Sequence, residues 1–210
     1  MYLSRLMLDP QHPLARRDLG SAYDMHRTLT RAFVTDAHAQ PSPFLWRLET
    51  SQNTAEACTL LVQSVTPAHW DIIQSLNGYA LRVQGNKKVD LGQFVQTGRR
   101  YRYRLLANPT VTRAGKRHGL TQEADQLAWL TLQGDKHGFK TLACLRVGHD
   151  LLRTHRSRSG EGITLQTVLL EGILQATDST ALQAVLRQGL GHGKSMGLGL
   201  LSLAPVANCL

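Results

Sequence analysis

The order of the predicted strands and helices constrains this chain most, because the same order occurs twice. In each half, short apolar segments typical of strands and amphipathic segments typical of helices follow as strand, helix, strand, strand, helix, strand. The first half places these elements at residues 2–8, 21–33, 44–49, 58–65, 67–76 and 79–84. A loop at 9–20 connects the first strand to the first helix. The second half places them at 101–107, 122–133, 142–152, 163–176, 182–188 and 198–203.

This repeated order is that of the ferredoxin-like or RNA-recognition-motif fold. We therefore predict an α+β protein of two tandem ferredoxin-like domains, each an antiparallel sheet with helices on one face. The domains are expected at residues 1–95 and 96–210. The first helix has a clear start, because Ser21 and Asp24 have the spacing of a capping box, in which each side chain satisfies the other's free backbone donor. Met25 and Leu29 then begin its core face.

The charge balance indicates a polyanionic partner. Lys and Arg number 24 against 15 Asp and Glu, which gives a net charge of +9. Basic enzymes that never touch nucleic acid also exist, so the placement of the charges must decide. With 42% hydrophobic residues, the chain falls outside the disordered class.

The cysteines indicate a reducing compartment. Cys58, Cys144 and Cys209 are odd in number and far apart, which argues against a disulfide framework and against a C-x-x-C metal site. We expect a cytoplasmic protein, since no apolar run reaches the roughly 20 residues of a membrane span. The nine histidines show no H-x-x-x-H spacing and no G-x-S-x-G elbow is present, so no metal, no cofactor and no serine hydrolase site is predicted.

The first helix carries residues suited to phosphodiester cleavage. A rotation of about 100° per residue places Tyr23, His26 and Thr30 on one exposed face, with Arg27 and Arg31 beside it. RNA supplies its own nucleophile, the 2′-hydroxyl. A ribonuclease without metal therefore needs only a proton acceptor, a proton donor and positive charges that stabilise the phosphorane. The alternatives stay open: His26 can be an ordinary surface histidine, Tyr23 can pack its ring on the preceding loop, and both arginines can be solvated charges.

A glycine-rich run precedes the last predicted strand. Its five glycines within eleven residues are Gly189, Gly191, Gly193, Gly197 and Gly199. Glycines allow backbone N–H groups to approach phosphate oxygens, and Lys194 and Ser195 lie between them, so the run is a candidate phosphate cradle. Gln188 breaks a Walker A motif and Met196 breaks G-x-G-x-x-G. A plain helix-to-strand connection explains one or two glycines but explains five poorly.

Three basic patches extend the candidate RNA surface. Arg100, Arg102 and Arg104 alternate along one strand face. The second patch lies in a glycine-containing loop and consists of Arg113, Lys116, Arg117 and His118. The third lies at the tip of a predicted hairpin and consists of Arg153, His155, Arg156 and Arg158. Any one of them can be a solvated edge. Three together suit the phosphates and 2′-hydroxyls of an A-form stem-loop.

Several of these segments resemble the CasE family, which supplies the CRISPR repeat endoribonuclease of the Cascade complex. The resemblance rests on the opening strand, on Arg16-Arg17-Asp18-Leu19, on Tyr23-Asp24-Met25-His26-Arg27-Thr28-Leu29, on Leu45-Trp46-Arg47-Leu48-Glu49 and on Arg104-Leu105-Leu106-Ala107-Asn108-Pro109. The pattern from Gly191 to Ser202 is similar to the glycine-rich loop of the wider repeat-associated (RAMP) superfamily.

The resemblance implies two tandem ferredoxin-like domains that bind a repeat hairpin and cut at the 3′ base of its stem without metal. The products would carry a cyclic phosphate and a 5′-hydroxyl, and the chain would stay in Cascade with mature crRNA. The family's catalytic histidine and tyrosine map on His26 and Tyr23, and two of its arginines map on Arg27 and Arg31. The arginine-bearing hairpin matches residues 153–158, and the glycine loop with Lys194 would help to hold RNA.

Two other classes of function fit the same features. A non-catalytic RNA-binding scaffold subunit needs the fold and the basic loops but no active site. A DNA-binding module would bind without depending on a 2′-hydroxyl.

Overall fold

The computed structural model describes residues 1–34, 40–49, 57–155 and 162–206. Its contacts divide the chain into two compact units. The first unit contains Met1–Val89 with the short segments Thr154–Gly162 and Ser195–Gly197. The second unit contains Asp90–Arg153, Ile163–Lys194 and Leu198–Leu210.

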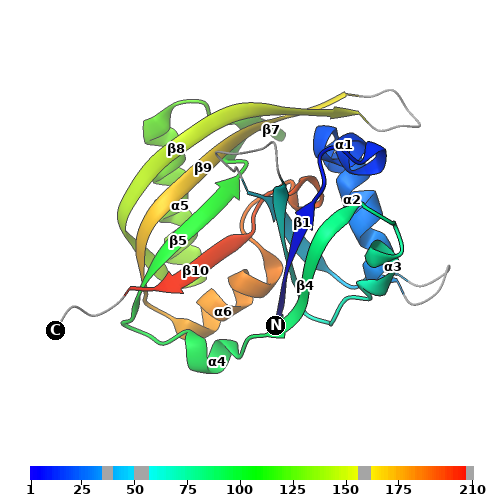
Figure 1. The fold of residues 1–210 in the computed structure, drawn as a ribbon. Helices are drawn as coiled ribbons and strands as arrows, with labels where there is room; N and C mark the ends of the chain where they lie inside the picture. Colours follow the sequence, from blue (N-terminus) through cyan, green and yellow to red (C-terminus); the bar gives the residue numbers. More distant parts are fainter. Residues whose placement is uncertain (35–39, 50–56, 156–161, 207–210) are drawn as a thin grey trace. The chain divides into compact units, whose positions relative to one another are not determined.

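The first unit has the ferredoxin-like arrangement that the sequence predicts. Its strands are β1 (Tyr2–Leu8), β2 (Phe44–Leu48), β3 (Cys58–Ser64) and β4 (Ala80–Lys88). They form an antiparallel sheet in the order β2-β3-β1-β4 (Figure 1). Its helices are α1 (Pro13–Gly20), α2 (Ala22–Thr30), the short 3-10 helix η1 (Arg31–Phe33) and α3 (Asp71–Gln74).

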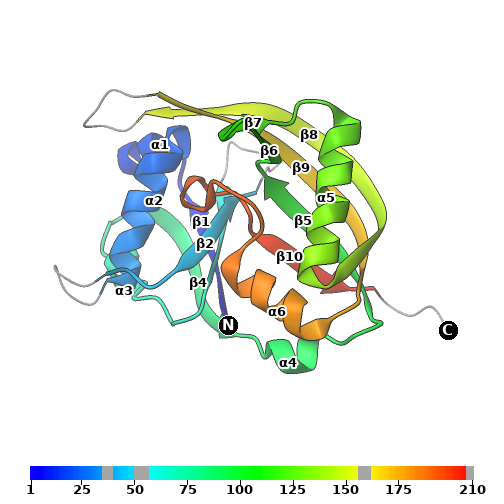
Figure 2. The ribbon, with the colours of Figure 1, turned by 180° about the vertical axis from the view of Figure 1, so that it is seen from behind.

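The core of this unit lies between the sheet and α2. Leu6 and Leu8 of β1 are fully buried, and Met25 and Leu29 of α2 belong to the same core cluster. Figure 2 shows α1, α2 and α3 on this side of the sheet. A helix of nine residues is too short to be stable alone in water. Burial of each large apolar side chain contributes about 1.5–3 kcal/mol, so packing holds α2 in place.

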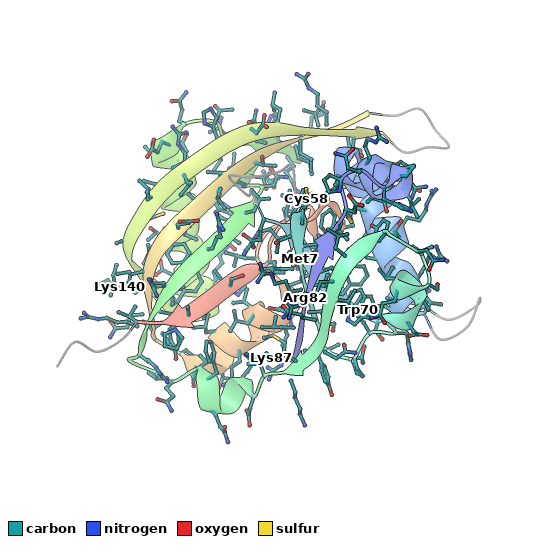
Figure 3. All side chains as sticks on the ribbon, viewed as in Figure 1. Met7, Cys58, Trp70, Arg82, Lys87 and Lys140 are labelled. Carbon is teal, nitrogen blue, oxygen red and sulfur yellow. The ribbon has the colours of Figure 1, made fainter. Side chains whose placement is uncertain are left out.

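The opposite face of the same sheet is more polar. The register of β1 with β4 sets Met7 against Arg82, and Figure 3 labels both side chains. Arg5 and Arg82 are exposed. Since successive side chains of a strand point to opposite faces, the alternation in β1 separates this basic face from the core.

The helix α1 occupies a segment for which the sequence predicts a loop, so that prediction is wrong. The helix begins with Pro13 at its first turn, where the missing N–H of proline costs nothing and its fixed φ favours helix. Ala15 and Asp18 are its buried residues. Leu14 and Leu19 also pack against the core, but over eight residues they are too few to give a helical periodicity.

The start of α2 is predicted only in part. The Ser21 hydroxyl accepts a hydrogen bond from the Asp24 N–H at 3.2 Å, as in a capping box. The reciprocal bond is absent from the described contacts, because the Ser21 N–H donates to the Asp18 carbonyl at 3.3 Å. The Asp24 carboxylate instead pairs with Arg27 at 3.2 Å. The preceding helix α1 thus supplies the acceptor that a loop would have lacked.

A buried carboxylate joins α1 to α2 and to the segment before β4. Asp18 is 1% exposed, and it accepts hydrogen bonds from the Tyr79 phenol at 2.9 Å and from Arg17 at 2.6 and 2.9 Å. Arg17 also donates to the Thr28 hydroxyl of α2 at 3.2 Å. Burial and the neighbouring Asp18 carboxylate raise the pKa of Tyr79, so its hydroxyl keeps the proton that it donates.

The second unit repeats the ferredoxin-like order. Its strands are β5 (Arg100–Ala107), β8 (Phe139–His155), β9 (Gly162–Ala176) and β10 (Leu201–Pro205), in the sheet order β10-β5-β9-β8. Its main helices are α5 (Glu123–His137) and α6 (Ser179–Gln188), which lie on one face of this sheet in both views (Figures 1 and 2). A short helix α4 (Leu91–Phe94) precedes β5, and the 3-10 helix η2 (Lys194–Met196) precedes β10.

The alternation predicted for β5 is confirmed. Tyr101, Tyr103 and Leu105 are buried, whereas Arg100 and Arg102 are exposed. On the exposed side, Arg104 forms an ion pair of 2.7 Å with Glu171, the residue opposite it on β9. The Glu171 carboxylate of the same sheet therefore neutralises one charge of this arginine row.

The second basic patch lies on a β-hairpin, and the predicted loop is wrong there. Strands β6 (Thr110–Arg113) and β7 (Lys116–Gly119) pair with each other around Ala114 and Gly115. Both turn residues have positive φ, 46° and 73°, as a two-residue hairpin turn requires. These polar four-residue strands carry no apolar alternation from which sequence could have recognised them.

Several element boundaries also differ from the predictions, since β4 and β8 are longer than predicted and α6 begins three residues earlier. The helix α5 runs on to His137 and ends at Gly138, whose φ of 72° and N–H bond to the Gly134 carbonyl form a left-handed cap. The helix α3 is shorter than the predicted 67–76. The last strand begins at Leu201, because the preceding glycines keep left-handed backbone up to Gly199.

The buried carboxylate predicts the effect of one hydroxyl. Tyr79→Phe removes the phenol that donates to Asp18 and should lower the free energy of unfolding by about 1–3 kcal/mol, because one oxygen of a buried acceptor loses its partner. Urea unfolding followed by circular dichroism measures this loss. Tyr2→Phe is the matched control, since Tyr2 has no hydrogen bond from its hydroxyl to the described residues. Equal midpoints for the two variants would contradict the assignment.

Candidate functional site

The helix α2 holds the predicted catalytic histidine against β2. The His26 imidazole stacks on the Phe44 ring, with centroids 5.0 Å apart and planes at 22°. Tyr23, His26 and Thr30 share one face as predicted, but all three are half-buried, so the expectation of a fully exposed face is wrong. The Thr30 hydroxyl donates to the His26 carbonyl at 2.7 Å. The difference in exposure arises because the apolar Phe44 ring of β2 packs against this face of α2.

The environment of His26 favours its neutral form. Burial lowers the pKa of the imidazole below its ordinary value of 6.5. Its Nδ1 atom is buried and has no hydrogen-bond partner within the described ranges. The ring is therefore uncharged near neutrality and able to accept a proton.

The other predicted residues of α2 remain available to a ligand. The Tyr23 hydroxyl has no hydrogen bond to any residue that the structure describes. Arg27 is exposed and pairs with Asp24 at 3.2 Å. Surface pairs of this kind contribute about 0–1 kcal/mol, so a phosphate can compete for this arginine. Arg31, at the end of α2, is exposed and has no ion pair among the described side chains.

The glycines of the C-terminal run each have a structural reason to be glycine. All five have left-handed φ, at Gly189 (77°), Gly191 (76°), Gly193 (82°), Gly197 (79°) and Gly199 (85°). A Cβ at Gly199 would lie 2.6 Å from the Leu190 carbonyl, and one at Gly193 would lie 2.8 Å from Leu198. A structural role in the connection from helix to strand, which the sequence suggested for only one or two glycines, thus accounts for all five. Their phosphate-binding role stays a prediction.

One of these glycines joins the run to β2. A Cβ at Gly197 would lie 2.7 Å from the Trp46 ring, which is 4% exposed. Trp46 and Phe44 are two residues apart on β2, so they point to the same face. The first unit therefore contains both the segment Ser195–Gly197 and His26, each of which has a neighbour on β2. Ser195 itself is exposed.

Basic side chains lie near one another within the second unit and are here called the Lys194 cluster. Its members are Arg117, Lys136, His137, His192 and Lys194. Burial lowers the pKa of His137 and of His192, and nearby positive charges lower both further. Lys136 and Lys194 act on His137, whereas Arg117 and Lys194 act on His192. Sequence reasoning named Lys194 and Arg117 but missed both histidines. His192 lies inside the glycine run and could have been found, whereas His137 ends a distant helix and carries no local signal.

The remaining predicted residues are spread along the second half of the chain. Arg113 and Lys116 are exposed and lie opposite each other on the β6–β7 hairpin, and Arg117 follows on β7. Arg153 is exposed near the end of β8. Arg156 and Arg158 lie outside the described residues. The structure thus relates Arg117 to Lys194 but does not relate Arg153 to either.

Two kinds of feature are absent from the described ranges. There, no group of three or more His, Cys, Asp or Glu side chains is placed to hold a metal ion. None of the helices described is both long and apolar enough to cross a membrane.

Comparison with known proteins gives matches along nearly the whole chain. Residues 1–205 match the protein family described as CRISPR associated protein. The chain is 36% identical to the CRISPR-associated endoribonuclease Cse3 of Thermus thermophilus, a match that covers 98% of this chain and 100% of that protein. It is 31% identical to the CRISPR system Cascade subunit CasE of Escherichia coli, with the same coverage.

Solved structures show the same similarity in three dimensions. A structure of the CRISPR endoribonuclease Cse3 bound to a 19-nucleotide RNA superposes with a TM-score of 0.88 at 36% identity. This match covers 98% of the present chain and 100% of the other. The similarity in sequence and the similarity in fold therefore both extend over the full length of these relatives.

The contact between Gly197 and Trp46 predicts a strong dependence on glycine. Gly197→Ala should lower the free energy of unfolding by about 1–3 kcal/mol more than Gly78→Ala, because only the first forces a buried ring to move. Both glycines have φ near +80°, and the atom nearest a Cβ at Gly78 is a His12 side-chain carbon 3.4 Å away. Gly78→Ala therefore controls for backbone strain in the same unit. Urea midpoints followed by tryptophan fluorescence compare them, and equal losses would contradict the tight contact.

Proposed function

Because this chain belongs to the family of CRISPR-associated proteins, we propose that it is an endoribonuclease that binds CRISPR repeat stem-loops in precursor crRNA and cuts them at the 3′ base of the stem. The observation that carries the proposal is the half-buried, neutral His26 on α2, with Tyr23 one turn away and Arg27 and Arg31 at its side. Full-length similarity to a protein named as a CRISPR endoribonuclease supports it.

The proposed reaction is an internal transfer at phosphorus that needs no metal. The 2′-oxygen of the nucleotide before the cut attacks the phosphorus and loses its proton to a base. The bond from phosphorus to the 5′-oxygen breaks, and that oxygen takes up a proton. The products are a 2′,3′-cyclic phosphate, or a 3′-phosphate after hydrolysis, and a 5′-hydroxyl.

The residues of α2 have distinct proposed roles in this reaction. His26 is neutral near pH 7 and exchanges a proton with the reacting oxygens, a contribution of about 10²- to 10⁴-fold. The Tyr23 hydroxyl, free of partners among the described residues, orients the phosphate or transfers the second proton. Arg27 and Arg31 stabilise the charge that develops on the phosphorane oxygens.

The proposed RNA surface combines the glycine run with the basic hairpins. Lys194 and Ser195, with the backbone at Gly191, Gly193, Gly197 and Gly199, contact the RNA backbone. The Lys194 cluster and the exposed residues Arg113, Lys116, Arg117 and Arg153 supply the charge that neutralises phosphates. For Arg156 and Arg158 the assignment rests on sequence alone.

Partners and location follow from the same proposal. A relative is named as a Cascade subunit, so we propose that this chain stays with mature crRNA and other Cascade subunits after cleavage. A cytoplasmic location is proposed from the cysteines, since Cys58 and Cys144 are free thiols. The second candidate is a non-catalytic RNA-binding scaffold, which the basic surface alone would also serve.

Replacement of His26 separates the enzyme from the scaffold. In excess EDTA, wild type should cut a labelled repeat hairpin at one site, and His26→Ala should cut at least about 100-fold more slowly, because general acid-base catalysis is lost. Denaturing gels measure the rate under single-turnover conditions. His69→Ala is the matched control, since His69 is an exposed histidine of the same unit.

Each outcome of this experiment has a consequence. Filter binding should give both variants the affinity of wild type. Tight binding by all three proteins without cutting by any would favour the scaffold. Loss of binding in folded His26→Ala would contradict a role limited to proton transfer.

The Lys194 cluster predicts that RNA binding depends on pH. Burial and nearby cations hold the pKa of His137 and His192 below 6.5 in the free protein, and a bound phosphate raises it. Binding therefore takes up protons, so affinity should rise as pH falls below 6.5, by at most about tenfold per pH unit for each histidine. Fluorescence anisotropy from pH 5 to pH 8, at about 0.15 M salt, measures this.

Two variants test the source of this pH dependence. His192→Gln removes one titrating group from the cluster and should reduce the slope of affinity against pH. His149→Gln, which replaces an exposed histidine of β8 in the same unit, should leave it unchanged. A slope that is the same in both variants and in wild type would exclude His192 from the RNA surface.

A further inference from the structure

The side chain that holds His26 is an aromatic ring. Catalytic histidines are commonly oriented by a hydrogen bond from the second ring nitrogen to a carboxylate or a carbonyl, which fixes both the tautomer and the ring plane. The Nδ1 atom of His26 is buried and has no such partner among the described residues. Its ring instead lies nearly parallel to the Phe44 ring, at 5.0 Å and 22°.

The Phe44 ring is itself held in a stack that reaches the core. Phe44 and Phe33 lie 4.4 Å apart with planes at 10°, and Phe33 meets Trp70 edge to face at 5.9 Å and 81°. The Trp70 Nε1–H donates to the Ser4 hydroxyl at 2.9 Å, and Figure 3 labels Trp70 beside β4. The stack thus runs from α2 through β2 and η1 to a hydrogen bond on β1.

The two aromatic residues beyond Phe44 in this stack are buried. Phe33 is 5% exposed and Trp70 is 5% exposed. Phe44 begins β2 and lies opposite Ser64 of β3. Aromatic pairs in such arrangements contribute about 0.5–1.5 kcal/mol beyond the burial of their area. The ring under His26 therefore has little freedom to tilt.

We propose that Phe44 is a positioning residue for catalysis, which holds the His26 imidazole in one orientation and shields its inner face from water. This inference rests on the proposed function, because it assigns a role to Phe44 in the same reaction. Phe44 contacts the imidazole ring, and its proposed role is therefore exerted through His26.

The surroundings of His26 connect this geometry to its titration. Burial is the cause of its lowered pKa, and no charged group in the described part of the chain contributes to that shift. The nearby charges of its own helix, Asp24 and Arg27, pair with each other. From β2, the group that faces the imidazole is the apolar ring of Phe44. Removal of this ring should admit water and return the His26 pKa toward 6.5.

The test compares three variants of the full chain with wild type. Phe44→Leu removes the stacking ring and keeps apolar volume, Phe44→Tyr keeps the ring, and Phe33→Leu disturbs the stack one ring away from His26. Histidine-labelled NMR titration, with the His26 signal assigned by its loss in His26→Ala, gives the pKa. The pH profile of single-turnover cleavage gives the rate and its inflection.

The expected results separate positioning from general packing. Phe44→Leu should raise the His26 pKa, shift the inflection of the rate upward by the same amount, and lower the rate by about 10- to 100-fold. Phe44→Tyr should match wild type in all three. Phe33→Leu keeps the Phe44 ring against the imidazole, so it should lower the urea midpoint, slow cleavage less than Phe44→Leu does, and leave the His26 pKa and the inflection unchanged.

The outcomes that overturn the proposal differ from those that overturn the function. Cleavage by wild type, with an unchanged His26 pKa and rate in folded Phe44→Leu, overturns the role of Phe44 alone. Identical losses in Phe44→Leu and Phe33→Leu without a pKa change also overturn it. Absence of cleavage by wild type overturns the proposed function, and the role of Phe44 falls with it.

Discussion

The packing of α2 against the sheet of the first unit is the interaction on which the proposed site depends. Met25 and Leu29 are buried in the core cluster with Leu6, and this burial fixes the rotation of a helix too short to stand alone. That rotation places His26 over Phe44 at the boundary between core and solvent. If the imidazole were buried more deeply, a substrate could not reach it. If it were fully exposed, nothing would lower its pKa or fix its orientation. The core thus sets the chemistry of the residue at its edge.

The glycine run shows that a structural role and a functional role can share one segment. Left-handed backbone and close contacts make glycine necessary from Gly189 to Gly199. The same tight turns expose Ser195 and place Lys194 near His137 and His192. Loops with irregular backbone commonly carry ligand-binding groups on a rigid scaffold. The glycines shape the loop, and the proposed contacts to RNA come from what they hold in place.

Much of the fold follows from the sequence, because apolar periodicity reports burial directly. The alternating faces of β5 were predicted for this reason, and the bounds of β1 were predicted from an apolar-rich segment that ends at Asp9-Pro10. The helix α1 was missed because it is only eight residues long, and the polar Asp18 interrupts the short apolar face made by Leu14, Ala15 and Leu19. The stack of Phe44 on His26 and the Lys194 cluster were missed because each joins residues from separate elements. Local patterns identify the residues that can react, and only tertiary structure shows what surrounds them.

The central claim is that the RNA supplies the nucleophile and that residues of α2 move the protons. The most direct measurement compares two repeat hairpins that differ only by a 2′-deoxy substitution at the scissile nucleotide, incubated with wild type in excess EDTA. The account predicts a single cut, with a 5′-hydroxyl end, in the all-ribose hairpin and none in the substituted one, although both bind equally. Cleavage of the substituted hairpin at the same site and rate would contradict it, because the attacking oxygen would then have to come from elsewhere.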